Sequence, residues 1–275
     1  MMGRMRATVM VMLLTTAAVY GGQTGGIDVQ DIIRKSVTAT EADWKEAPKY
    51  SYIERDVTSK KDRSEKTKTY QVLMIEGSDY NKLVALNDRP LSQEQARTEE
   101  EKLQAEIANR QHESPKERRR RIAKYQKERS QDEAMMREMA EAFNFKLICE
   151  TKLNGRDTYE FQATPKPGYV PKSRETRMLT AMEGKLWVDK ATYQWAKVEA
   201  QVMRPVIFYG IAKVGPGTRF ELEQAPVAGD LWMPTHFAVN VNASAFGFIN
   251  EDSTDDESYS GYRPMDQTGA LQARK

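Results

Sequence analysis

The chain contains few of the residues that most often serve in catalysis, metal binding and disulfide formation, namely cysteine and histidine. It contains one cysteine, Cys149, and two histidines, His112 and His236. A single cysteine excludes an intramolecular disulfide, so the fold depends on its core alone. The histidines lack the spacing of a zinc site, and no nucleophile elbow, phosphate loop or dinucleotide fingerprint is present. We therefore expect no catalytic residue, no metal and no cofactor.

Cys149 itself ends the mainly apolar segment 145–149. Strand alternation would place it on the same face as Phe145 and Leu147. A nucleophilic cysteine would need a partner base, whereas a free cysteine among apolar neighbours is usually a small buried side chain. The sequence therefore predicts a buried, unreactive thiol.

Long hydrophobic runs are lacking apart from residues 7–19. This run is shorter than the ~20 helical residues that cross a bilayer. Arg4 and Arg6 precede it and Gly21 and Gly22 follow it, a pattern typical of a secretory signal peptide. We predict a signal peptide over residues 1–22, with an uncleaved anchor as the alternative.

The run is not followed directly by a cysteine that could carry a lipid anchor. Cleavage would therefore leave a protein with no stable membrane span. We expect an exported protein that works in a bacterial periplasm or outside the cell.

An excess of one charge is also missing. Beyond residue 22 the chain has 40 basic and 40 acidic residues. A general polyanion binder would show a basic excess, so we expect no nucleic acid partner. A hydrophobic fraction of 39% and a charged fraction of 30% are typical of a folded domain with a wet surface.

The first part of the exported chain predicts a helix and then strands. Residues 27–44 have an apolar stripe at helical spacing, with Asp28 as a fair N-cap. Residues 50–58, 69–76 and 80–87 follow as strands with short connections. Such connections cannot make parallel crossovers, so an antiparallel meander is expected.

Residues 92–143 hold 24 charged residues, 12 of each sign, and no glycine. Capping boxes at Ser92 and Ser114 predict two helices, about 92–112 and 115–142. Their apolar stripes are thin, so we expect an insertion that lies on the sheet or projects from it. The arginines 118–121 could grip a phosphate or a lipid headgroup. Alternatively, they are solvated and neutralised by nearby acids, namely Glu113, Glu117 and Glu128.

The remaining chain predicts more hairpins. Asn154 and Gly155 form a strong two-residue hairpin signal, and further strands are expected at 186–188, 193–202, 206–214, 218–223, 231–232, 235–249 and 259–262. The acidic residues at 251–257 could hold calcium, but they lack the glycine and spacing of such a loop, which favours a solvated loop. The fold class expected from these elements is α+β and mainly β, with a large antiparallel sheet that is strongly curved or partly closed. We expect one domain over 23–264, with the helical insertion at 92–143, and a flexible tail over 265–275.

Many aromatic residues fall on the predicted strands. They could form the core of a half-covered sheet. They could also line an apolar hollow between sheet and helix, open to a lipid-like ligand. The candidate ligand-binding residues are Trp187, Trp195, Phe208, Phe220, Trp232 and Phe237.

The segment 184–199, GKLWVDKATYQWAKVE, together with the export signal, the N-terminal helix and the strands, resembles the periplasmic lipoprotein-sorting carriers of the LolA/LolB type. The chain is also similar to uncharacterised exported bacterial proteins with the same segments. The resemblance covers residues 145–250 most specifically. It implies that the large curved antiparallel sheet is an unclosed half-barrel, covered by helix, with an apolar cavity.

Three functions stay open at this point. The first is non-catalytic binding of an apolar or lipid-like ligand in a cavity between sheet and helix. The second is an envelope scaffold or sensor that binds a partner protein through residues 92–143. A hydrolase has the least support, because no pair of acids is singled out among the many present.

Overall fold

The computed structural model describes residues 27–60, 65–208, 212–241, 243–245, 249–250 and 253–265. The predicted signal peptide, 1–22, lies outside the described residues, as does the chain from residue 266 onward.

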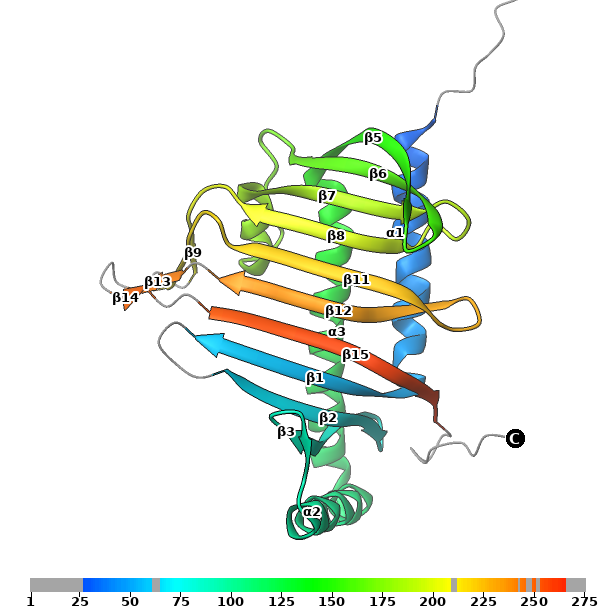
Figure 1. Ribbon diagram of the computed structural model, residues 1–275, viewed down its shortest axis with the longest axis vertical. Coiled ribbons are helices and arrows are strands. Elements are labelled where there is room, and N and C mark those ends of the chain that lie inside the picture. Colours follow the sequence, from blue (N-terminus) through cyan, green and yellow to red (C-terminus); the bar gives the residue numbers. More distant parts are fainter. Residues whose placement is uncertain are drawn as a thin grey trace, which may run out of the picture.

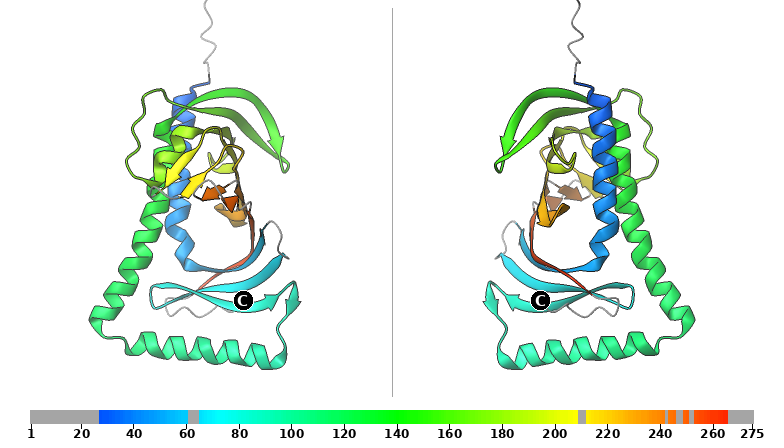
Figure 2. Two further views of the ribbon diagram at one scale, coloured as in Figure 1. Left: turned by 90° about the vertical axis from the view of Figure 1, so that its left-hand side faces the viewer. Right: turned by 90° about the vertical axis from the view of Figure 1, so that its right-hand side faces the viewer.

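One large antiparallel sheet dominates the described part of the chain (Figure 1). Its eleven strands run in the order β4-β3-β2-β1-β15-β12-β11-β8-β7-β6-β5. The sheet curves without closing, with β4 and β5 at its two edges (Figure 2). The predicted α+β half-barrel is therefore confirmed. Its strands are β1 (Tyr50–Lys60), β2 (Lys66–Ile75), β3 (Ser78–Leu86), β4 (Arg89–Pro90), β5 (Phe143–Leu153), β6 (Arg156–Pro165), β7 (Met182–Asp189), β8 (Trp195–Val202), β11 (Arg219–Ala228), β12 (Leu231–Val241) and β15 (Ser253–Pro264).

Two long helices, α1 (Val29–Glu46) and α3 (Pro115–Ala142), lie behind this sheet in Figure 1. We call that side of the sheet the covered face and the other side the open face. The helix α2 (Gln93–His112) lies beside β3 and leads back into α3 (Figure 2). Short 3-10 helices, η1 (Ala47–Lys49) and η2 (Glu175–Ala181), precede β1 and β7.

The helices begin where their local sequence predicts. The Asp28 carboxylate accepts a hydrogen bond from the Asp31 amide at 3.0 Å and starts α1. Ser92 and Ser114 each form a reciprocal capping box, which starts α2 and α3. The helices predicted over 92–112 and 115–142 are therefore confirmed.

The core lies between the covered face and the two long helices. Ile32 and Ile33 of α1 pack on Phe161, Leu186 and Val188 of the sheet. The C-terminal end of α3 enters the same layer, since its Ala142 is buried in a cluster with other apolar side chains of the sheet and η2. The helix α3 is thus part of the core, although its thin stripe predicted an insertion with one neighbour.

The acidic segment near residue 255 differs from its prediction. Instead of a solvated loop, residues 253–264 form β15, which pairs with β1 on one side and β12 on the other. Alternating side chains of a central strand face opposite sides of the sheet, so a polar sequence can still occupy this position. As a result, Glu257 and Asp255 lie on the covered face. Met265, the first residue of the predicted tail, is buried against Leu73 and Leu103, and the rest of that tail lies outside the described residues.

The thiol of Cys149 is exposed rather than buried. A register shift in β5 between Leu147 and Cys149 marks a β-bulge. A bulge adds one residue to a strand and reverses the faces of the side chains beyond it. Cys149 therefore leaves the face on which Phe145 and Leu147 pack.

The strand predicted over 206–214 is interrupted. Its ends belong to a separate sheet with the strand order β14-β13-β10-β9 in the described chain. These strands are β9 (Val206–Phe208), β10 (Ala212–Val214), β13 (Ala243–Ala245) and β14 (Ile249–Asn250).

Candidate functional site

The six candidate ligand-binding residues lie on both faces of the large sheet. Trp187 and Trp232 pack together on the open face with Ala196 and Leu153. Trp195, Phe220 and Phe237 lie on the covered face by strand register. The side chain of Phe208 is outside the described part of the chain. The six therefore do not surround one cavity, and whether any of them contacts a ligand stays a prediction.

The space around Trp195 on the covered face is filled. The indole Nε1–H of Trp195 donates to the Ser36 hydroxyl of α1 at 2.9 Å. The hollow that remains beside it has a volume of only about 50 Å³. This end of the sheet therefore matches the alternative in which the aromatic residues form the core.

A larger cavity lies at the other end of the covered face. It has a volume of about 260 Å³ and is bounded by α1, η1, α3 and strands β1, β2, β12 and β15. We call it the tyrosine cavity after its aromatic wall, which consists of Trp44, Tyr50, Tyr52, Tyr125, Tyr259 and Tyr262. A groove of about 650 Å³ adjoins the cavity, since both are lined by Trp44, Pro48, Met74, Tyr125 and Arg129.

Three tyrosines from β1 and β15 form the sheet side of the cavity. The ring centroid of Tyr52 lies 6.0 Å from that of Tyr259 and 5.3 Å from that of Tyr262. The Tyr262 hydroxyl donates to the Pro234 carbonyl at 2.6 Å. Burial raises the pKa of each of these three phenols, which keeps them neutral.

The helix side of the cavity carries Arg129. Its guanidinium lies 4.4 Å from the ring centroid of Trp44 and 5.8 Å from that of Tyr125. It also donates to the Trp44 carbonyl oxygen. The Nε1–H of Trp44 is buried and has no acceptor among the described residues. An unpaired buried donor costs roughly 1–3 kcal/mol, so a bound acceptor would be favourable there.

Carboxylates complete the surroundings of the cavity. Asp79, Glu128 and Asp132 line it. Just beyond the tyrosines, Glu257 accepts a hydrogen bond from the Tyr259 hydroxyl. Burial, helped by the neighbouring carboxylates of Asp56 and Glu257, raises the pKa of Glu54 to about 8. Burial also raises the pKa of Asp132.

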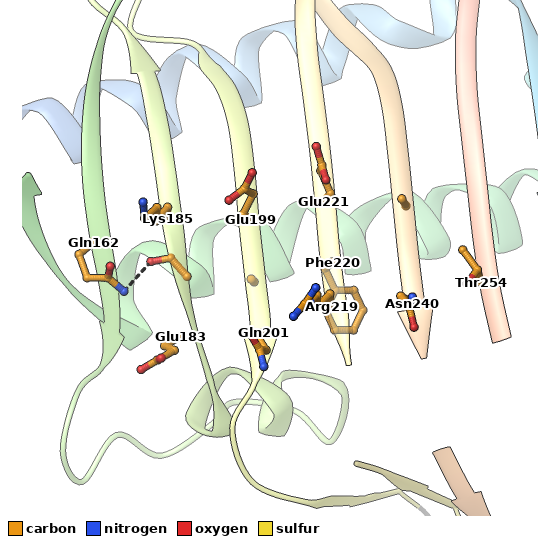
Figure 3. A pocket seen from close by; sticks show the side chains of 13 residues that line it. Gln162, Glu183, Lys185, Glu199, Gln201, Arg219, Phe220, Glu221, Asn240 and Thr254 are labelled. Atoms are coloured by element: carbon orange, nitrogen blue, oxygen red, sulfur yellow. Dashed lines mark hydrogen bonds between the residues drawn. The ribbon is translucent and has the colours of Figure 1, made fainter. Parts of the chain in front are cut away.

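A different hollow, of about 630 Å³, lies on the open face (Figure 3). It is lined mainly by polar side chains of neighbouring strands, including Lys185, Arg219 and Glu221. Two of its five charged side chains pair with neighbouring strands: Glu221 contacts Lys197 at 2.6 Å, and Lys185 contacts Glu160 at 3.0 Å. These ion pairs between strands match a solvated sheet face.

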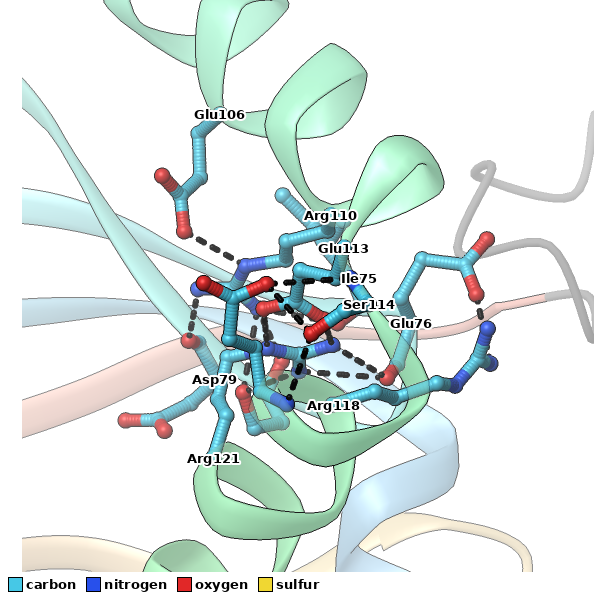
Figure 4. Close-up of polar contacts among 11 residues, drawn as sticks. Ile75, Glu76, Asp79, Glu106, Arg110, Glu113, Ser114, Arg118 and Arg121 are labelled. Atoms are coloured by element: carbon cyan, nitrogen blue, oxygen red, sulfur yellow. Dashed lines mark hydrogen bonds and ion pairs between the residues drawn. The ribbon is translucent and has the colours of Figure 1, made fainter.

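The arginines near the start of α3 hold the corner between α2 and α3 against the sheet (Figure 4). Arg121 pairs with Glu113 at 2.7 Å, and Arg118 pairs with Glu76 at 2.7 Å. Buried Arg110 of α2 donates to the carbonyl oxygens of Ile75, Ser78 and Asp79. Two of the four arginines 118–121 thus pair with protein acids. Of the acids named in the second alternative, only Glu113 is such a partner, because Glu117 caps α3 and Glu128 contacts Lys124.

The groups that could serve catalysis lie apart. His236 contacts Asp256 at 2.9 Å, and His112 is bound to its own helix at the Ala108 carbonyl. Cys149 is far from both in the fold, on an edge strand. The described residues contain no group of histidine, cysteine or acidic side chains arranged to hold a metal ion. No helix in the described ranges has the length and apolar character needed to span a bilayer.

No protein-family model and no curated protein matches this sequence. Solved structures do match over most of the chain. A LolA superfamily protein from Nitrosomonas europaea is 12% identical, with 86% of this chain and 93% of that chain covered and a TM-score of 0.32. A DUF1329 family protein from Desulfovibrio piger is 12% identical, with 86% and 92% covered and a TM-score of 0.35.

The complex of MucA and MucB from Pseudomonas aeruginosa also matches. It is 10% identical, with 86% of this chain and 98% of that chain covered and a TM-score of 0.23. In fold, the chain resembles the LolA superfamily, as its sequence predicts. TM-scores this low support no conclusion about function, which we draw from this chain's own residues.

Proposed function

We propose that this is a non-catalytic binding protein of the bacterial envelope, and that its ligand is an amphiphilic small molecule held in the tyrosine cavity. The observation that carries the proposal is the cavity itself, about 260 Å³ between α1, α3 and the sheet. Ligand sites are typically concave and mostly apolar, with a few polar groups that orient the ligand. The tyrosine cavity has that composition.

The adjoining groove sets the shape of the ligand. Because the groove and the cavity share Trp44, Met74 and Tyr125, one molecule can extend through both. An elongated amphiphile would therefore fit better than a compact one.

A cavity-filling substitution tests the proposal. We expect Ala47→Phe to fill the cavity, because Ala47 lines it. Ala42→Phe, on an exposed position of the same helical segment, is the matched control. Binding is followed with the neutral fluorescent probe N-phenyl-1-naphthylamine. We expect the control to bind like the wild type and Ala47→Phe to lose on the order of tenfold in affinity.

Equal binding of the probe by Ala47→Phe and Ala42→Phe would contradict the assignment of the ligand to the tyrosine cavity. Absence of probe binding by the wild type would contradict the proposed function. Native mass spectrometry of the protein purified from its own envelope gives an independent check. We expect a copurified amphiphile in the wild type and less of it in Ala47→Phe. A wild-type protein with no bound molecule would count against ligand carriage.

The sequence alternative, a scaffold that binds a partner protein through α2 and α3, stays a prediction. The contacts of Arg110 and Arg121 favour a rigid arm over a flexible one. Deletion of residues 92–143 would remove α3 from the core, so it cannot test the arm alone. Charge reversal at exposed Arg119 and Arg120 leaves α3 in the core and tests this alternative better. The measurement is whether the variant still captures the partner.

A further inference from the structure

The aromatic wall of the tyrosine cavity already binds one positive charge. The Arg129 guanidinium lies over Trp44 at 4.4 Å from the ring centroid. Aromatic faces attract cations by about 0.5–1 kcal/mol when exposed and ~2 kcal/mol when desolvated. The rings of Tyr52, Tyr259 and Tyr262 form a second aromatic surface, and no cation of the described residues lies over these three rings. This surface is open to a cation of a ligand.

The charges around the cavity favour the same sign of ligand. Its lining contains three carboxylates, Asp79, Glu128 and Asp132, and one guanidinium, that of Arg129. Among the described residues, only Lys124, at 3.9 Å from Glu128, forms an ion pair with any of these three acids. The Glu257 carboxylate lies behind the tyrosines and adds to the negative excess, whereas Glu54, whose pKa burial raises to about 8, is protonated near neutral pH.

Arg129, which lies near Asp132, offsets only part of this excess. Its guanidinium donates to the Trp44 carbonyl and is stacked on two rings, so its donors are partly used within the protein. An anionic head group would have to lose water beside Asp79 and Asp132, which costs more than a single shared guanidinium returns. A neutral head group would gain little from either the rings or the acids.

We propose that the tyrosine cavity selects amphiphiles whose head group is an organic cation, such as an ammonium, over neutral and anionic amphiphiles. The inference rests on the function proposed above, ligand binding in the same cavity. Asp79 and Asp132 attract the charge, the three tyrosines form one aromatic wall beside it, and the apolar tail lies along the groove.

Three probes with one tail test the head group: decyltrimethylammonium, decyl maltoside and decyl sulfate. Each is titrated calorimetrically into the wild-type protein below its critical micelle concentration. We expect the cation to bind on the order of tenfold more tightly than the maltoside, and the sulfate more weakly than both. The double variant Asp79→Asn/Asp132→Asn should lose most of the preference for the cation over the maltoside.

Glu221→Gln, the same change of chemistry on the open face, is the control and should keep the preference for the cation. Equal binding of the three probes would overturn the inference and leave ligand binding intact. Tightest binding of the sulfate would also overturn it and point to Arg129. Binding of none of the probes would overturn the proposed function as well. A double variant that no longer folds, judged by circular dichroism, is replaced by Asp79→Asn alone, for which the same loss of preference is expected.

Discussion

The indole nitrogen of Trp195 donates a hydrogen bond of 2.9 Å to the hydroxyl of Ser36. Ser36 is fully buried on α1, and Trp195 begins β8, so this contact joins the N-terminal helix to the middle of the sheet. The Ser36 hydroxyl in turn donates to the Ile33 carbonyl at 2.8 Å. The pair fixes where α1 lies on the covered face, and therefore where Trp44 meets the cavity.

Replacement of this contact should destabilise the protein measurably. We expect Trp195→Phe to lower the free energy of unfolding by about 1–3 kcal/mol, through the lost hydrogen bond and the space left by the smaller ring. Urea denaturation gives the value. In a double-mutant cycle with Ser36→Ala, a coupling energy near zero would show that the hydrogen bond does not stabilise the fold.

Buried Arg110 should contribute more to the stability of the protein than any other arginine of α2 and α3. It is 6% exposed and donates to three carbonyl oxygens of the β2–β3 turn and to Glu106. Arg110→Met leaves those acceptors without their donor, and we expect a loss of about 3 kcal/mol. Arg119→Met, on the exposed side of α3, should change stability by less than about 0.5 kcal/mol. Equal losses in the two variants would contradict the assigned contacts.

Glu54 predicts how stability depends on pH. Burial raises its pKa to about 8 in the folded protein, from 4.5 for the free side chain. Between these values the folded state holds a proton that the unfolded state has released, so stability falls as the pH rises. The ionisable groups that interact with Glu54 are Asp56 on β1, Asp79 on β3, Glu257 on β15 and the phenols of Tyr52, Tyr259 and Tyr262.

Glu54→Gln should remove much of that pH dependence. We expect its melting temperature to exceed that of the wild type by about 2–4 °C at pH 8 and to match it near pH 5. Thermal unfolding from pH 5 to 8.5 checks this, with Glu101→Gln on exposed α2 as control. A wild-type protein that gains stability as the pH rises over this range would show that Glu54 is ionised when folded.

Cys149 should be accessible but slow to react. Its thiol is exposed, while partial desolvation and the hydrogen bond to Glu160 raise its pKa. Only the thiolate reacts, so alkylation by a maleimide at neutral pH should be complete but slower than that of free cysteine. Glu160→Gln should accelerate it. A thiol that reacted only after denaturation would contradict the exposure of Cys149 and the β-bulge in β5 that explains it.

The sequence predicted the helix starts and the hairpin turn, because these features depend on residues that are close together in the chain. The caps at Asp28, Ser92 and Ser114 act within one turn of the chain, so the helices could be predicted from the sequence. Asn154 and Gly155 both adopt positive φ, 50° and 80°, as a two-residue hairpin requires, so that turn could be predicted as well.

The candidate site could not be predicted in this way. Tyr52 and Tyr259 come from opposite ends of the chain and meet only because β15 enters the sheet between β1 and β12. The acidic sequence of β15 resembles a loop, and its strand character depends on partners distant in sequence. A cavity also forms where side chains do not fill the space between the helices and the sheet. Hydrophobic periodicity in the sequence does not show where this happens.

The central claim is that an amphiphilic cation binds among the tyrosines of the covered face. A crystal structure of the protein with decyltrimethylammonium tests this most directly. We predict density for the ammonium group against the wall formed by Tyr52, Tyr259 and Tyr262, within reach of Asp79, with the tail running along the groove past Met74. Density for the probe on the open face alone, or an empty cavity at a saturating concentration of the probe, would contradict the account.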